Sequence, residues 1–502
     1  MLRKNPKLDR GGNVSGQNLN NIMWKITIDN FQGGFAPKWY DSTYPAFGNK
    51  NQAGDMQNVD LTNPSYLTQG PGLATLTAGD QTGAITTLLK GIWDGAVASD
   101  VTYGTGGNKL HKISSTAVII TSPFDDGTGG HTITHDGSEL GEDVAHYQGN
   151  LYYSYNQTGA IGCIGKYDLA STFDDDWSQQ APTGKADLQS APHQMCVGLN
   201  DRLYIANGRY VADYIGSTDT LNVTSLDLPT GTIVQSIKWL NDRLWIGANV
   251  SSLTGSNRIR SSIYIWDGVA DSWEAEIPVS GRIGALYVKN GVVFVWYSDI
   301  SGYYKLGYVN GSAITDIASF SGALPDYYQV TEYKDYILWN SNGLIFAYGS
   351  GDKDLPLKLF QYADGGFSTV GGLACPFGTP MVASNQSTSY KLAKFSGYDT
   401  ACYWKSLMFD VLQDNKLAVL TKVIVNFEQL AANARVDLSL VNNKGTIVFT
   451  DTISNTKLGA ATNYHMPLNI STENFRIQFD YTNGNTTNPV KIKNVLIYGR
   501  DS

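Results

Sequence analysis

The sequence predicts an all-β chain, folded as a β-propeller of six to seven blades with an extended N-terminal strip and a C-terminal β-sandwich domain. Three observations predict this class. A hairpin-like stretch recurs with a period in the mid-forties, glycine and tyrosine are abundant at 53 and 30 of 502 residues, and no long apolar stripe has helical spacing. Few helices are therefore expected.

The recurring stretch is clearest in LNDRLYIANG, residues 199–208, which returns 41 residues later as LNDRLWIGAN, residues 240–249. Asn and Asp tolerate unusual backbone angles and bond to their own backbone, so an Asn-Asp pair favours a tight turn. The aromatic and branched residues after each pair are typical of a half-buried strand. Each copy is therefore predicted to be a β-hairpin.

Weaker copies of this hairpin lie in step with the two clear ones. We call the residue aligned with Leu203 and Leu244 the anchor of its copy, and the anchors are Thr102, Leu151, Leu203, Leu244, Val293, Ile337 and Val382. Their separations are 49, 52, 41, 49, 44 and 45 residues. Most copies also have an apolar strand before the turn and a third, alternating strand after it, as propeller blades do. The blade count is six or seven because the first and last copies are the faintest.

Composition divides the chain into three predicted domains. Residues 1–80 are rich in Asn, Gln, Gly and Pro, and turn formers at this density predict an extended strip without a core of its own. A strand late in this strip is a candidate to close the propeller, which is placed at residues 81–402. Residues 403–502 alternate apolar and polar side chains more cleanly, as at 435–441 and 475–481, which predicts an antiparallel β-sandwich.

Targeting signals are not expected. No apolar stretch follows the basic first ten residues, and no run of about 18 apolar residues suggests a membrane span. The chain is therefore expected to be soluble and made in a cytoplasm. A frayed, solvated terminus is favoured for the basic arm and docking on a partner is the alternative; the arm carries Arg3, Lys4, Lys7 and Arg10.

Candidate metal ligands are few. In GGHTITHD, His131 and His135 would share one strand face beside Asp136, but a third ligand is missing and a polar hairpin is favoured. The stretch FDDDW, residues 173–177, resembles a calcium loop only in its charge, so a solvated loop is favoured. Buried free thiols are expected for four cysteines that form no CxxC pair: Cys163, Cys196, Cys375 and Cys402.

Catalytic motifs are also missing from the sequence. It has no Gly-x-Ser-x-Gly elbow and no phosphate-binding loop, and GTGGNK, residues 104–109, is interpreted as a hairpin turn. The Ser-x-Asp-x-Gly-x-Thr-Trp boxes of sialic-acid-cleaving propellers are absent. Sequons at Asn156 and Asn469 are expected by chance. The sequence therefore predicts no catalytic, cofactor-binding or metal-binding residue, no cofactor and no enzyme activity.

The net charge limits the role of nucleic acid. A net charge of −9 argues against a protein that grips phosphates, which requires a basic face. An acidic channel wall repels phosphate and lets DNA slide past without sticking. DNA is therefore expected only as a passing partner.

Both ends of the chain resemble a known family. DNFQGGFAPKWYDSTYPAFGNKNQAGDMQNVDL, residues 29–61, followed by LTQGPGLATL, residues 67–76, resembles the start of tail hub or nozzle proteins of short-tailed bacteriophages. In that family a Gly-Gly motif and a Gly-Pro-Gly-like entry precede a propeller. YWKSLMFDV, residues 403–411, and VKIKNVLIYGR, residues 490–500, are similar to the closing β-domain. The motifs are weakly specific, although the likeness in architecture spans nearly the whole chain.

The resemblance implies a structural virion protein located in the phage tail and made in the host cytoplasm. Several copies, a hexamer in the family, would form a ring below the portal and adaptor proteins, and DNA would leave through its middle. Tail fibre or needle proteins are further implied partners. Two alternatives stay open: a glycan-binding or glycan-cleaving propeller of a receptor-binding fibre, which a glycan array would reveal, and a host-type interaction propeller. Against the latter, Trp-Asp occurs only at residues 93–94 and 266–267 and Gly-His only at 130–131, not once in each copy of the repeat.

Overall fold

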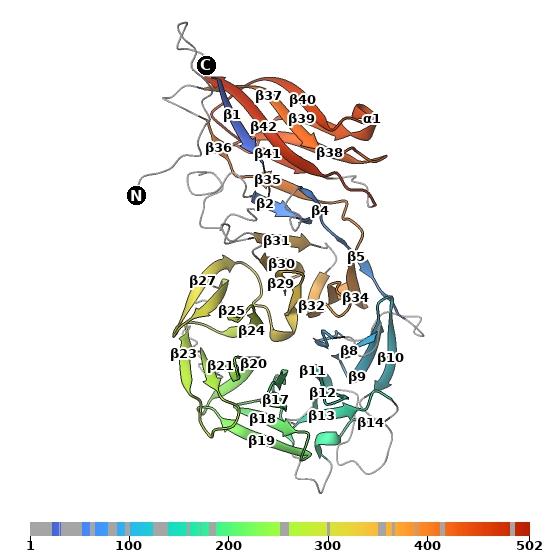
Figure 1. Ribbon diagram of the computed structural model, residues 1–502, viewed down its shortest axis with the longest axis vertical. Helices are drawn as coiled ribbons and strands as arrows, with labels where there is room; N and C mark the ends of the chain where they lie inside the picture. The colour runs from blue at the N-terminus through green and yellow to red at the C-terminus, as the bar shows by residue number, and fades with distance from the viewer. Residues whose placement is uncertain are drawn as a thin grey trace. The chain divides into compact units, whose positions relative to one another are not determined.

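The computed structural model describes 17 stretches of the chain: residues 23–29, 31, 53–60, 66–78, 88–95, 101–123, 139–157, 161–170, 172–179, 187–250, 261–298, 302–349, 358–363, 367–386, 389–411, 417–481 and 487–501. The regular secondary structure of these residues is almost entirely β-strand (Figure 1). Helix is limited, in the described part, to α1 (Asn455–Leu458) and the 3-10 turns η1 (Trp177–Gln179) and η2 (Tyr327–Gln329). The prediction of an all-β chain is confirmed.

The chain forms two compact units. The larger comprises Thr75–Gly343 and Gly365–Lys394, and the smaller comprises Met1–Ala74, Leu344–Asp364 and Phe395–Ser502. The three predicted domains, 1–80, 81–402 and 403–502, stay a prediction.

The larger unit consists of antiparallel sheets whose strands follow one another in chain order. The first sheet holds β7 (Gly91–Ile92), β8 (Val101–Gly106), β9 (Lys109–Ser114) and β10 (Ala117–Pro123), with β6 (Thr77–Ala78) parallel to β10. The second holds β11 (Leu140–Tyr147), β12 (Asn150–Gln157), β13 (Ile161–Tyr167) and β14 (Phe173–Asp174), with β15 (Leu188–Gln189) beside β13. The third holds β16 (Met195–Gly198), β17 (Arg202–Asn207), β18 (Tyr210–Ile215) and β19 (Thr220–Asp227).

Four more sheets continue this order. The fourth holds β20 (Thr232–Leu240), β21 (Arg243–Val250), β22 (Ser261–Trp266) and β23 (Ala275–Val279). The fifth holds β24 (Ile283–Lys289), β25 (Val292–Ser298), β26 (Tyr304–Asn310) and β27 (Ala313–Phe320). The sixth begins with β28 (Val330–Tyr333) and β29 (Tyr336–Ser341), and the seventh holds β32 (Phe367–Ala374), β33 (Met381–Gln386) and β34 (Ser389–Ser396).

The seven anchors occupy one equivalent place in these sheets. Each is the second residue of the second strand of its sheet, in β8, β12, β17, β21, β25, β29 and β33. All seven side chains are buried. The turns before the two clearest copies have positive φ at Asp201, Asn241 and Asp242, as the Asn-Asp signal predicts. The predicted equivalence of the anchors is confirmed.

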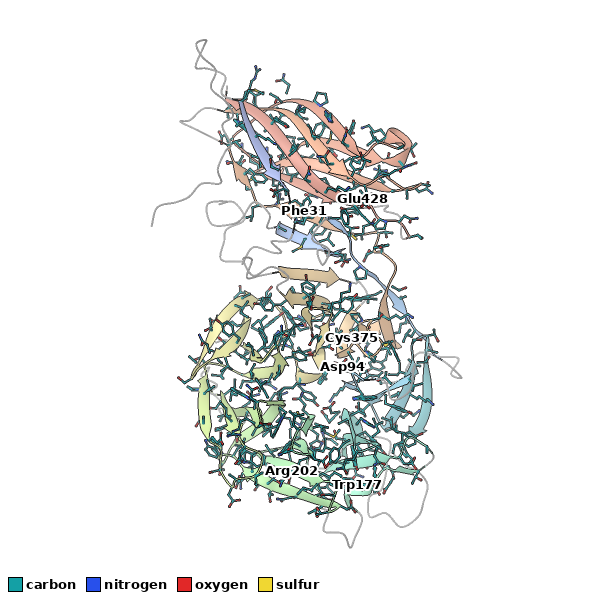
Figure 2. All side chains as sticks on the ribbon, viewed as in Figure 1. Phe31, Asp94, Trp177, Arg202, Cys375 and Glu428 are labelled. Carbon is teal, nitrogen blue, oxygen red and sulfur yellow. The ribbon has the colours of Figure 1, made fainter. Side chains whose placement is uncertain are left out.

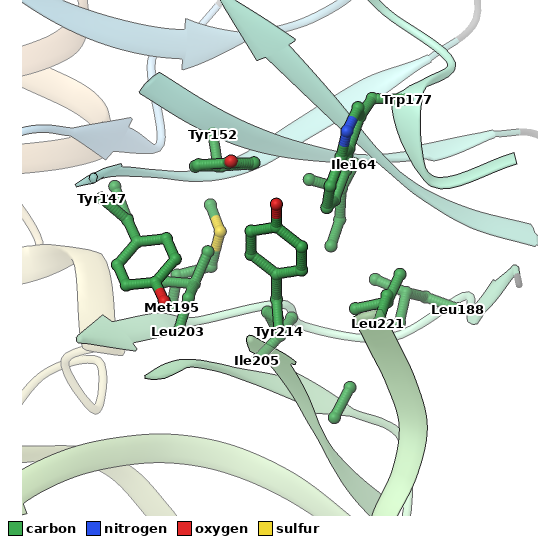
Figure 3. Packing of buried hydrophobic residues seen from close by; sticks show 12 residues of the cluster. Tyr147, Tyr152, Ile164, Trp177, Leu188, Met195, Leu203, Ile205, Tyr214 and Leu221 are labelled. Carbon is green, nitrogen blue, oxygen red and sulfur yellow. The ribbon is translucent and has the colours of Figure 1, made fainter. Parts of the chain in front are cut away.

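The first strands of the seven sheets lie in a closed cyclic order. β7, β11, β16, β20, β24, β28 and β32 each contact the next, and β32 contacts β7. Figure 1 shows the sheets of this unit around a common centre. Apolar cores lie between neighbouring sheets, such as Tyr152 and Trp177 of the second against Leu203 and Tyr214 of the third (Figure 3). Another core joins Ile113 of the first sheet to residues of the seventh, so the first and last sheets also pack together.

The smaller unit contains two larger antiparallel sheets. One has the order β1 (Met23–Ile28), β42 (Ile492–Asp501), β37 (Ala418–Phe427) and β40 (Asn463–Thr472). The other has the order β2 (Ala53–Gln57), β35 (Tyr403–Ser406), β41 (Asn474–Asp480), β38 (Arg435–Asn442) and β39 (Ile447–Ser454), with β36 (Phe409–Asp410) beside β41. Shorter strands are β3 (Val59–Asp60), paired with β4 (Thr68–Gln69), β5 (Gly72–Thr75), and β30 (Leu344–Gly349), paired with β31 (Lys358–Ala363).

Residues from the predicted strip are integral to these sheets, which sequence analysis did not anticipate. All six residues of β1 pair with β42, from Met23 opposite Arg500 to Ile28 opposite Val495. The Trp24 ring occupies the space beside Gly499, where a Cβ would lie 2.1 Å from a ring carbon. A buried aromatic cluster also joins Phe31 to Trp404, with ring centroids 5.1 Å apart.

Candidate functional site

The candidate site is a group of hydrogen-bonded polar side chains, most of them buried or half-buried, on and beside the first strands of the larger unit. We call this group the polar centre; its members are Lys90, Asp94, Glu142, Asp143, Gln194, Gln235, Ser236, Asp326, Tyr327 and Thr331. Several of these residues stand at a fixed offset from an anchor. Glu142, Gln194 and Gln235 each precede their anchor by nine residues. The repeat therefore brings chemically similar side chains to one place.

Glu142 joins three sheets through its carboxylate. Lys90, just before β7, donates to Oε1 over 3.0 Å, and the Asn156 amide donates to the same oxygen over 3.1 Å. Tyr327 Oη, at η2 before the sixth sheet, donates to Oε2 over 3.1 Å. Burial raises the pKa of Tyr327, so its hydroxyl keeps its proton and remains a donor. The second and sixth sheets are not neighbours, so this bond spans the centre.

Asp326 holds the turn that carries Tyr327. Its Oδ1 accepts from the Tyr327 backbone N–H over 2.8 Å, and the Gln329 side chain accepts from the Asp326 N–H, which together form a capping box. Gln235 of the fourth sheet donates to the same Oδ1 over 2.7 Å. Burial is the main cause that raises the pKa of Asp326.

Asp143, next to Glu142, fixes the third sheet to the second. Its Oδ2 accepts from the Met195 backbone N–H over 2.8 Å, and its Oδ1 accepts from the Val144 N–H over 2.9 Å. Burial raises the pKa of Asp143 to about 7, although both backbone bonds favour the carboxylate.

The same kind of bond recurs at other junctions between sheets. Gln194 Oε1 accepts from Ser236 Oγ over 2.8 Å and from the next backbone N–H, and Ser236 Oγ accepts from the Leu286 N–H over 3.0 Å. Asp94 accepts from Thr331 Oγ1 over 2.7 Å and from the Cys375 backbone N–H (Figure 2). Burial raises the pKa of Asp94. The polar side chains thus connect the sheets around the ring of first strands.

The chemistry of the polar centre is that of internal hydrogen bonding. Its carboxylates receive donors from neighbouring sheets, which is how buried polar groups are satisfied in a stable fold. Among the described stretches, no three His, Cys, Asp or Glu side chains are grouped as metal ligands. In the same stretches no helix is long and apolar enough to cross a membrane.

The structure describes only some of the residues that were singled out from the sequence. His131, His135, Asp136 and the basic arm at residues 3–10 lie outside the described residues. Residues 104–109 form the turn of the β8–β9 hairpin, with Gly107 at φ 53°, as expected. Of the four cysteines, Cys163 and Cys402 are buried, as expected, and Cys196 and Cys375 are half-buried.

The acidic stretch at 173–177 is not the solvated loop that was expected. Asp175 and Asp176 are buried beside β13, and Tyr155 Oη donates to Asp176 Oδ1 over 3.1 Å and to the Asp175 carbonyl. This acidic run is therefore a buried part of the second sheet. The hydrogen bond from the Tyr155 hydroxyl offsets part of the cost of burying the Asp176 carboxylate.

Sequence analysis missed the polar centre and two buried histidines. His193 is packed against Gly162, and its Nε2 lies 2.7 Å from the Gln189 carbonyl oxygen. Burial lowers the pKa of His193 and of His111, the latter to about 4, so both rings are neutral at physiological pH. One feature of the sequence could have located the polar centre: a polar residue stands nine positions before the anchors Leu151, Leu203 and Leu244.

Comparison with known proteins identifies no relative: no protein-family model and no curated protein matches the chain.

Proposed function

We propose that the seven sheets are the blades of a β-propeller and that the two large sheets of the smaller unit form a β-sandwich. The cyclic order of the first strands supports the propeller, as do the apolar cores between neighbouring sheets, including the first and the last. A propeller also accounts for the repeat in the sequence, because one supersecondary unit per blade buries its apolar faces only against its neighbours.

We propose further that the chain is a structural virion protein of a tailed bacteriophage, a subunit of a tail hub or nozzle ring below the portal and adaptor. The partners in this proposal are further copies of the chain, six in the family it resembles, together with portal or adaptor proteins and tail fibre or needle proteins. The resemblance of both chain ends to that family supports the assignment. A rigid body of sheets with internally bonded polar groups is also what a scaffold requires.

The observation that carries the proposal is the contact between Tyr327 and Glu142. It spans the centre of the larger unit, and both residues are buried there. A passage for DNA therefore cannot run through the centre of a single chain. In the proposed assembly, DNA passes through the middle of a ring of copies, and the net charge of −9 favours passage without binding.

Electron microscopy of virions tests the assignment. Cryo-EM maps, with the chain located by antibody labelling, are expected to show several symmetry-related copies around the DNA exit channel. Copies found only at fibre tips, or absence of the chain from purified particles, would refute the proposal.

Two truncations separate assembly from folding. Removing residues 1–60 deletes β1 and β2, which pair with β42 and β35, so it destabilises the smaller unit whether or not a ring forms. Removing residues 1–22 leaves both strands in place. If residues 1–22 contribute to the bond between copies, the short truncation lowers attachment to capsids while the isolated chain unfolds as the full chain does. Normal attachment would contradict a role for these residues.

We propose that the chain has no enzyme activity. Purified protein is expected to turn over none of a panel of nucleic acids, nucleotides, peptides and polysaccharides. Reproducible cleavage of any glycan would instead favour the glycan-cleaving alternative.

A further inference from the structure

A pocket opens beside the polar centre, where the fourth, fifth and sixth sheets meet. Its volume is about 370 Å³, within the range of roughly 300–1,000 Å³ typical of small-molecule sites. Four polar side chains line it, and Leu324 and Pro325 contribute apolar wall; the polar residues are Gln235, Arg282, Ser298 and Asp326. All of these residues belong to the larger unit.

One side of the pocket presents hydrogen-bond acceptors. Oδ1 of Asp326 takes the donors from Gln235 and the Tyr327 N–H, so Oδ2 receives no donor from the described residues. The same bond fixes the Gln235 amide, because its Nε2 points to Asp326 and its Oε1 is left without a described partner. Gln235 is only 4% exposed, so these acceptors are pre-positioned rather than mobile.

Two further lining residues supply hydrogen-bond donors. Arg282 is exposed, and its guanidinium forms no ion pair with a carboxylate in the described part of the chain. Its backbone is held by Ser298, whose N–H donates to the Arg282 carbonyl over 2.8 Å and whose Oγ accepts from the Arg282 N–H over 3.1 Å. The Ser298 hydroxyl hydrogen remains available. The pocket therefore suits a ligand that carries both hydrogen-bond donors and an anionic group.

We propose that this pocket binds one carbohydrate unit that carries a carboxylate, such as a hexuronate. Adjacent hydroxyls donate to Asp326 Oδ2 and Gln235 Oε1, the sugar carboxylate pairs with Arg282, and the C–H face of the ring contacts Leu324 and Pro325. Arginine forms strong, directional pairs with carboxylates, which selects an acidic sugar over a neutral one. The inference does not depend on the proposed ring, because the pocket lies within one chain.

Saturation-transfer NMR and titration calorimetry on the full chain test the proposal with glucuronate, glucose and glucosamine. Glucuronate is expected to bind more tightly than glucose. Arg282→Gln should weaken glucuronate about tenfold, the loss of one charge-assisted pair, and leave glucose unchanged. Asp326→Asn should weaken both sugars. Arg209→Gln is the matched control, since that arginine pairs with Asp227 outside the pocket.

Three results would overturn the inference. The first is that glucuronate does not bind to the wild-type chain. The second is that the wild type and Arg282→Gln bind glucuronate equally well. The third is that glucosamine binds more tightly than glucuronate. If Asp326→Asn fails to fold because its turn is lost, Arg282→Gln still decides, because the Arg282 side chain is exposed. Binding of glucuronate would leave the ring proposal as it stands, and the virion maps test that proposal separately.

Discussion

Replacing Tyr327 with Phe should destabilise the larger unit measurably, although only one oxygen atom is removed. The Tyr327 hydroxyl donates to Glu142 Oε2 over 3.1 Å, and the Glu142 side chain is 9% exposed. Hydrogen bonds to charged groups contribute about 1.5–3 kcal/mol. Glu142 keeps its donors from Lys90 and Asn156, so we expect a loss near the lower bound, about 1.5–2 kcal/mol. Tyr327→Ala also removes a buried ring and should cost about 3–5 kcal/mol.

Equilibrium unfolding in guanidinium chloride, followed by tryptophan fluorescence, measures these losses. Hydrogen exchange of peptides from β11 and β28 assigns the affected transition to the larger unit. Tyr210→Phe is the control, since the Tyr210 hydroxyl makes no hydrogen bond within the described residues, and this variant should unfold like the wild type. If Tyr327→Phe is as stable as Tyr210→Phe, the contact across the centre does not hold the sheets together.

Three further predictions use the same unfolding assay. Leu244→Asp should cost several kcal/mol because the side chain is 0% exposed, whereas Leu199→Asp, at an 84% exposed site, should change stability by no more than about 0.5 kcal/mol; equal losses would contradict the repeat. Gly162→Ala should cost about 1–3 kcal/mol because its Cβ would lie 2.2 Å from a carbon of the His193 ring, and a neutral result would contradict that packing. Burial raises the pKa of Asp143 from 3.8 to about 7, so its contribution to stability is present below about pH 4 and is lost as the pH rises through about 7. Asp143→Asn should flatten that part of the profile, and an unchanged slope would refute the assignment.

The local part of the fold could be predicted from the sequence. The turn before Leu244 needs residues that accept positive φ, and Asn241 and Asp242 supply them at φ 51° and 55°. The strand after the turn needs alternating apolar residues, and Leu244 and Ile246 are both buried. Because these requirements act within a few residues and recur in each copy, periodicity alone located every anchor strand.

Pairings between distant residues could not be predicted in the same way. MWKITI at residues 23–28 has the pattern of a strand, but nothing in it identifies β42 as its partner. Glu142 and Tyr327 are 185 residues apart, and neither belongs to a motif. Asp175 and Asp176 were predicted to be solvated because Tyr155, whose hydroxyl donates to both residues, is 20 and 21 residues away. Sequence patterns report local preference, whereas these contacts are set by how the sheets assemble.

The pairing of β1 with β42 also sets the order in which the protein can be completed during synthesis. Ile28 pairs with Val495, 467 residues later. At about 5–20 residues per second, the ribosome needs roughly 20–90 seconds to make the intervening chain. Throughout this time Trp24 has no sheet to cover and β1 has no neighbour in β42. In the sequence the larger unit lies wholly between the two strands, so it can fold before β42 has been made. The sheet that contains β1 can close only after β42 has left the ribosome.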